Sequence, residues 1–166
     1  MNCLKLLWWP APSQSQEAVI AVETNRPAAV DPLSHRLRPA EDPLTDFFWR
    51  SGADGWLRFQ TCGACGYRTH PAGPVCARCL STDLAPQPVS GLGTVVTFTV
   101  NVQQWDAGQE PYVIAMVGID EQADLRLTTN IVECDPWSVA IGDRVSVAFL
   151  ERHGYFYPLF RPASDR

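Results

Sequence analysis

The sequence lacks the patterns by which most enzyme classes are recognised. It contains no Gly-x-Ser-x-Gly motif, no His-Glu-x-x-His motif, no glycine-rich phosphate loop and no dinucleotide fingerprint. Histidine, the side chain used most often for acid–base chemistry, occurs only as His35, His70 and His153. None of the three can be paired with a serine or cysteine nucleophile from the sequence. We therefore expect no independent active site.

Long apolar runs and positive charge are also scarce. No run approaches the length of about 20 residues that a membrane-spanning helix needs, so we expect a soluble protein. The apolar stretch at residues 6–9 is too short for a signal peptide, and Pro10 interrupts it. Lys5 is the only lysine, and the formal net charge is −5 at pH 7. Such an acidic chain argues against a general affinity for nucleic acid or anionic membranes.

What the chain does have is two pairs of cysteines at metal-ligand spacing. Ten residues separate Cys62-Gly-Ala-Cys65 from Cys76-Ala-Arg-Cys79. Zinc takes four thiolates tetrahedrally, which leaves no position for a catalytic water, so these cysteines predict a structural zinc. The alternatives are two disulfides or four unrelated thiols, and the paired spacing favours zinc. Because thiolate ligands must stay reduced, we expect a cytoplasmic protein.

His70 lies in the loop between the two cysteine pairs. A histidine can replace a thiolate as a zinc ligand. Since four cysteines are already present, we expect a surface position or a supporting position beside the metal for His70, and not ligation.

Residues 1–40 carry five prolines and show no helical period, which is typical of a loosely ordered N-terminal arm. The alternative is that the true start lies further along the chain. The next methionine is Met116, so such a start would use a valine codon.

Residues 41–56 predict an aromatic docking helix. Asp42 suits the N-cap, Pro43 suits the first helical position, and Gly52 is a natural end. Because apolar side chains recur at helical spacing, one side of this helix is strongly apolar.

Phe47 and Phe48 lie on this apolar side, whereas Trp49 lies off it. Two interpretations stay open, because aromatic side chains mark both protein cores and interface centres. Both faces of the helix bury in the chain's own core, or one face contacts a partner.

Beyond the helix, the pattern predicts a mainly β protein. A strand at residues 56–60 leads into a zinc ribbon that spans residues 57–88, and Pro86 and Pro88 indicate a short stiff joint. Five strands in residues 89–166 suit a small closed barrel, for which the OB-fold is the commonest architecture, and an SH3-like barrel fits almost as well. The predicted barrel strands are residues 94–102, 112–119, 125–132, 145–150 and 155–160.

Zinc ribbons and OB barrels both suggest a module that binds single-stranded nucleic acid, and this is the alternative function. Such a module needs a basic groove. From residue 89 onward, five arginines stand against ten acidic residues, so this half carries a net charge of −5. An acidic barrel opposes phosphate contacts, and we expect no nucleic-acid partner.

The order of these segments is itself distinctive. The aromatic helix precedes the two cysteine pairs, and four short motifs follow: Gly91-Leu-Gly-Thr94, Pro111-Tyr112-Val-Ile-Ala, Ile141-Gly-Asp143 and Phe160-Arg-Pro162. Over roughly residues 42–163, this ordered set resembles the domain-of-unknown-function-35 family. Members of that family join a rubredoxin-like zinc ribbon to an OB-fold.

The resemblance implies a function. Members accompany thiolase-like enzymes, and sometimes hydratases, that act on acyl-CoA substrates. The resemblance implies that this chain is a non-catalytic auxiliary subunit of a thiolase-like enzyme, a hydratase or an aldolase. Such a subunit helps to assemble the enzyme and to hold or pass the CoA thioester.

The resemblance also implies roles for particular residues. It implies no catalytic residue, and His70 departs from the apolar residue or proline that the family often has before Pro71. The implied zinc ligands are Cys62, Cys65, Cys76 and Cys79, and the implied partner-facing helix residues are Phe47, Phe48 and Trp49.

Overall fold

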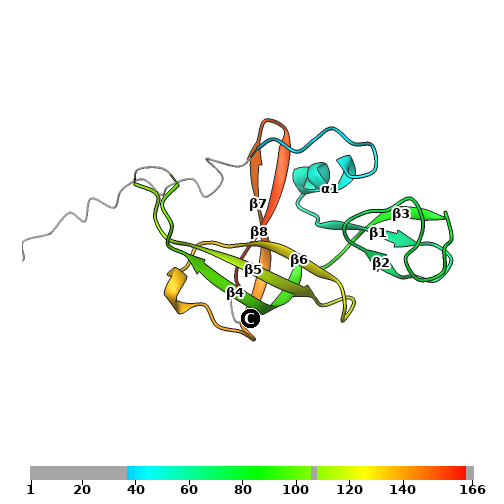
Figure 1. The fold of residues 1–166 in the computed structure, drawn as a ribbon. Helices are drawn as coiled ribbons and strands as arrows, with labels where there is room; N and C mark the ends of the chain where they lie inside the picture. Colours follow the sequence, from blue (N-terminus) through cyan, green and yellow to red (C-terminus); the bar gives the residue numbers. More distant parts are fainter. Residues whose placement is uncertain (1–36, 106–107, 164–166) are drawn as a thin grey trace, which may run out of the picture.

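Two sheets of unequal size organise the chain, as a computed structural model shows (Figure 1). The structure describes residues 37–105 and 108–163, so the predicted arm at residues 1–40 lies almost wholly outside the described residues. A three-stranded ribbon projects from one side of a closed five-stranded barrel, and one short helix lies between the ribbon and the last two barrel strands. The mainly β architecture predicted from the sequence is confirmed.

The helix is shorter than residues 41–56. It comprises α1 (Asp46–Arg50) followed by a 3-10 turn, η1 (Ser51–Asp54). Asp42 begins a separate turn, because its Oδ1 accepts a 2.9 Å hydrogen bond from the Leu44 N–H and its carbonyl accepts from Asp46. The helix therefore begins later than Asp42 predicts.

The α-helix ends at Arg50, with Ser51 as its C-cap, so it stops directly before Gly52 as predicted. Gly52 lies inside η1, and the chain turns at Gly55, whose φ is 82°. A Cβ atom at Gly52 would lie 2.6 Å from the Phe156 Cβ. Glycine is needed at position 52 because the helical segment approaches the barrel closely there.

The ribbon contains β1 (Arg58–Cys62), β2 (Arg68–Thr69) and β3 (Leu84–Pro88), in the spatial order β2-β1-β3. The predicted joint at Pro86 and Pro88 is wrong, because both prolines lie in β3 and pair with β1. Proline donates no backbone hydrogen bond but is tolerated on an edge strand, and β3 is an edge of this sheet.

The barrel closes in the order β4-β5-β6-β8-β7. Its β6 and β8 strands are parallel and the other neighbours are antiparallel, which is the OB-fold arrangement, so the SH3-like alternative is wrong. The strands are β4 (Leu92–Asn101), β5 (Tyr112–Ile119), β6 (Arg126–Ile131), β7 (Arg144–Arg152) and β8 (Tyr155–Pro162). A second 3-10 turn, η2 (Pro136–Ser138), lies between β6 and β7.

One continuous core joins the three parts. Phe48 from α1, together with Leu57 and Phe59 beside and within β1, belongs to the same buried cluster as the inward side chains of the barrel. Because burial of a large apolar side chain stabilises a fold by about 1.5–3 kcal/mol, these contacts hold the ribbon and the helix against the barrel. Within the described residues, no helix is long and apolar enough to cross a membrane.

Candidate metal centre and docking surface

The four cysteine sulfurs converge where the end of β1 meets the loop that precedes β3. Their Sγ atoms all lie within 4.8 Å of one another. The Cys62 and Cys79 sulfurs are 3.6 Å apart, and those of Cys65 and Cys76 are 3.7 Å apart. A tetrahedral zinc with Zn–S bonds of about 2.3 Å separates its sulfur ligands by about 3.8 Å. The cluster therefore fits a zinc ion, and it has four protein ligands with no open position.

The two cysteine pairs are built on matching backbone turns. Gly66, four residues after Cys62, has a φ of 72° and donates a 2.8 Å hydrogen bond to the Cys62 carbonyl. Leu80, four residues after Cys76, has a φ of 61° and donates a 3.0 Å hydrogen bond to the Cys76 carbonyl. The second turn therefore places a leucine in the left-handed conformation that favours glycine.

Backbone N–H groups support the thiolate form of Cys76. The N–H groups of Cys79 and Arg78 lower the pKa of the Cys76 thiol, and the Arg78 N–H lies 3.4 Å from the Cys76 sulfur. Because metal binding requires deprotonated cysteines, these amides favour ligation. His70 is not part of the cluster, which agrees with the prediction that it is no ligand. The predicted surface position, or supporting position beside the metal, is wrong, because the ring packs against Phe48 and Phe59.

His70 lies instead in an aromatic cluster between α1 and the ribbon. Its ring centroid is 4.7 Å from that of Phe48 and 5.3 Å from that of Phe59. Burial lowers the pKa of His70 to about 4, so the ring is neutral at pH 7.

The three aromatic residues of α1 point in different directions. Phe48 is 5% exposed and belongs to the core, whereas Phe47 and Trp49 are half-buried. Trp49 packs against Tyr157 of β8, with ring centroids 5.7 Å apart. Among the three residues implied as partner-facing, only Phe47 and Trp49 offer surface to a partner.

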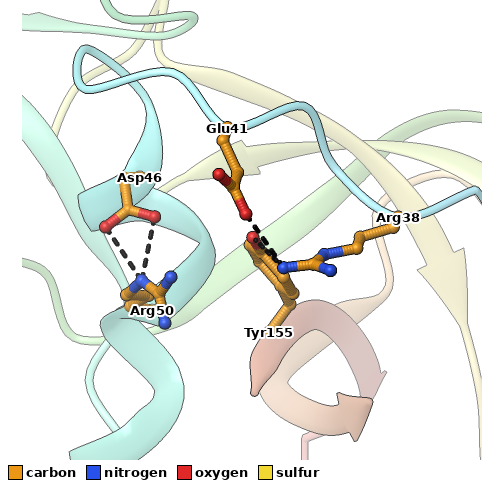
Figure 2. Close-up of polar contacts among 5 residues, drawn as sticks. All are labelled: Arg38, Glu41, Asp46, Arg50 and Tyr155. Atoms are coloured by element: carbon orange, nitrogen blue, oxygen red, sulfur yellow. Dashed lines mark hydrogen bonds and ion pairs between the residues drawn. The ribbon is translucent and has the colours of Figure 1, made fainter. Parts of the chain in front are cut away.

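Two arginines fasten the helix and its lead-in segment to the barrel (Figure 2). The guanidinium carbons of Arg38 and Arg50 lie 5.1 and 5.2 Å from the centroid of the Tyr155 ring, and Arg38 donates a 3.2 Å hydrogen bond to the Tyr155 hydroxyl. Arg38 also pairs with Glu41 at 3.0 Å, and Arg50 with Asp46 at 2.8 Å. No local sequence pattern predicts this arrangement, because residues 38 and 155 are far apart in the chain.

Two family models match consecutive parts of the chain. The rubredoxin-like zinc ribbon domain of ChsH2 matches residues 49–85, and the C-terminal OB-fold domain of ChsH2 matches residues 86–150. These matches agree with the metal cluster and with the barrel.

Two curated relatives are DUF35 domain-containing scaffold proteins. That of Methanothermobacter thermautotrophicus is 35% identical over 91 residues, which are 53% of this chain and 67% of the relative. That of Methanocaldococcus jannaschii is 37% identical over 91 residues, which are 53% of this chain and 63% of the relative. The chain thus spans about two thirds of these relatives.

Two solved structures share the fold. A chain of the Ltp2-ChsH2(DUF35) aldolase is 34% identical with a TM-score of 0.69, and the match covers 76% of this chain and 100% of that chain. A DUF35 protein of unknown function from Sulfolobus solfataricus has a similar fold, with a TM-score of 0.53 at 15% sequence identity. The match covers 73% of this chain and 86% of that chain. On these matches and on the ribbon–barrel architecture, the chain belongs to the DUF35 family.

Proposed function

We propose that this protein is a non-catalytic, zinc-binding subunit of an enzyme complex that processes acyl-CoA thioesters. Its partner is a thiolase-like enzyme, or an aldolase or hydratase of related function. The subunit helps to assemble the partner and to hold or pass the CoA thioester. The observation that carries the proposal is the match to the Ltp2-ChsH2(DUF35) aldolase at 34% identity over the whole of that chain.

The metal centre supports a structural role. Four cysteines would complete the coordination of a zinc ion, so no position would be left for a water or a substrate. The zinc would hold the two turns of the ribbon together, and the ribbon in turn shares its core with α1 and the barrel. These contacts present Phe47 and Trp49 from a fixed position, which suits a docking surface.

The barrel surface disfavours the alternative of a nucleic-acid-binding module. Arg144 forms an ion pair with Asp120, and Arg161 forms one with Glu133 at 3.1 Å. These acidic partners reduce the positive charge available for phosphate contacts. The alternative predicts salt-sensitive binding to a labelled single-stranded oligonucleotide, which we expect to be absent at low salt.

Activity of the reconstituted pair tests the proposed function. A candidate thiolase-like partner from the same organism would be assayed for acyl-CoA turnover alone and with this chain added, and this chain would be assayed alone. We expect turnover by the pair, little by the partner alone and none by this chain alone. Equal turnover by the partner with and without this chain, or turnover by this chain alone, would contradict the proposal.

A further inference from the structure

A cavity of about 220 Å³ lies where α1, the ribbon and the barrel meet. Helix α1 contributes Phe47 and Trp49, and the ribbon contributes Thr69 and His70. The barrel strand β6 contributes Thr128, whose side chain is exposed at the cavity. From these features we propose that the cavity receives one tyrosine side chain of the partner protein. The inference rests on the proposed function and names the anchoring contact of that partner.

The size of the cavity selects a single side chain. Sites for whole small-molecule ligands measure about 300–1,000 Å³. At about 220 Å³ the cavity is smaller, and its aromatic and proline walls would contact a ring on several sides. Buried aromatic side chains in such pockets commonly dominate the affinity of protein–protein interfaces.

Thr69 and His70 bring to the cavity wall polar groups that lack hydrogen-bond partners within the described residues. The Thr69 hydroxyl oxygen is shielded from solvent and has no partner there. The ring of His70 has none in that part of the chain either, although it packs against Phe48 and Phe59. A shielded hydroxyl without a partner costs about 1–3 kcal/mol, so a ligand that satisfies it is favoured.

The chemistry of the wall specifies a neutral group that both donates and accepts. Among the described residues, no Asp, Glu, Lys or Arg lines the cavity, which disfavours a charged ligand. The hydroxyl of Thr69 donates and accepts, and the neutral imidazole of His70 offers one donor and one acceptor. A phenol has both functions on an aromatic body, whereas an indole N–H only donates and a phenylalanine ring does neither.

The wall is held in place by the ribbon itself. The Gln60 side chain accepts a 2.9 Å hydrogen bond from the Gly73 N–H, which ties the loop after His70 to β1. The site is therefore formed before a partner binds, and a preformed site avoids the entropy cost of ordering it.

Binding of small phenols to the full-length, zinc-loaded chain tests the inference. The probes are p-cresol, which mimics tyrosine, and toluene, which lacks the hydroxyl; both would be titrated while backbone amide NMR signals are recorded. We expect p-cresol to shift the signals of Thr69, His70 and Ala72 and to bind about threefold or more tightly than toluene. Absence of these shifts, or equal affinity for both probes, would overturn the inference.

Three variants sharpen this test. Thr69→Val keeps the shape of the side chain and removes the hydroxyl, so it should lower p-cresol affinity toward that for toluene, with the contact to His70 retained, while leaving toluene binding unchanged. Thr128→Phe should fill the cavity and abolish binding of both probes. Thr99→Phe, at an exposed threonine of β4 away from the cavity, is the matched control and should bind both probes like the wild type. Binding by Thr128→Phe at wild-type strength would overturn the inference.

The complex with the thiolase-like protein separates this inference from the proposed function. We expect Thr128→Phe to weaken the complex at least tenfold and Thr99→Phe to leave it unchanged. If both variants assemble like the wild type, the cavity is not the anchor, although the proposed function stands. If the wild type forms no complex, the proposed function fails and the partner assignment of the cavity fails with it, even where p-cresol binds.

Discussion

The Tyr67 hydroxyl donates a 2.7 Å hydrogen bond to Asp124 Oδ2, across 57 residues of sequence. Beside it, the Gln122 side chain accepts a 2.8 Å hydrogen bond from the Arg68 N–H and donates one of 2.9 Å to the Arg68 carbonyl. The turn between β5 and β6 thus pairs with the ribbon through side chains. Together with the shared core, these contacts fix the orientation of the ribbon on the barrel.

Truncation of Gln122 should loosen this attachment. Gln122→Ala removes both hydrogen bonds to Arg68, and we expect the free energy of unfolding to fall by about 1–2 kcal/mol in urea denaturation. Gln87→Ala, at an exposed position of β3, is the matched control and should stay within about 0.5 kcal/mol of the wild type. Equal stability of the two variants would show that the Gln122 contacts do not contribute.

Removal of the metal should unfold the ribbon. We expect about one zinc per chain by elemental analysis, and loss of folded structure when a chelator is added, because the short ribbon has little core of its own. Cys62→Ser should have the same effect, whereas Cys134→Ser, outside the cluster, should retain the metal. A chelated protein with an unchanged melting curve contradicts this prediction.

The matching cysteine turns predict opposite effects of two substitutions. Leu80→Gly should stabilise the zinc-loaded protein by about 0.5–1 kcal/mol, because it relieves the left-handed backbone of a side chain that is 74% exposed. Gly66→Leu should destabilise it by about 1–2 kcal/mol, since the side chain gains strain in the same conformation. Thermal melts of both variants would measure these changes in stability. A lower melting temperature for Leu80→Gly than for the wild type would contradict the prediction.

His70 makes stability depend on pH. Its folded-state pKa of about 4 lies below the ordinary value of 6.5, so between these pH values the folded protein binds fewer protons than the unfolded chain. The neutral ring therefore contributes its full share to the free energy of unfolding above pH 6.5. This share is lost as the pH falls toward 4. Between pH 7 and pH 5 we expect a loss of about 2 kcal/mol.

Comparison with His70→Phe isolates this effect, because acid also protonates the zinc thiolates in both proteins. Urea denaturation at pH 7 and pH 5 should show a smaller loss for the variant, by about 2 kcal/mol. Identical losses for the two proteins would mean that His70 is not buried in its neutral form.

The barrel and the metal site could be predicted because their signals are local. β5 (Tyr112–Ile119) is a short run of apolar residues with one glycine, bounded by turn residues, and such a run is a local strand signal. The five barrel strands begin and end within two residues of their predicted bounds. The spacing of the cysteine pairs likewise predicts a metal site without any information from distant residues.

The docking surface could not be predicted in the same way, because it depends on contacts between distant residues. No local sequence pattern shows that Phe48 faces the core while Phe47 and Trp49 stay half-exposed. Likewise, the contact of Arg38 with Tyr155 spans 117 residues and has no local pattern. The cavity needs α1, β2 and β6 together, so only the folded chain reveals it.

Light scattering during size-exclusion chromatography, which gives the mass of the complex formed with the thiolase-like protein, shows whether this chain is a subunit of that enzyme. We expect one peak that contains both proteins, for the wild type and for Trp137→Ala, whose exposed indole lies on η2 away from α1. Phe47→Ala should weaken the complex. Separate elution of the two wild-type proteins, at concentrations at which each is folded, would contradict the account.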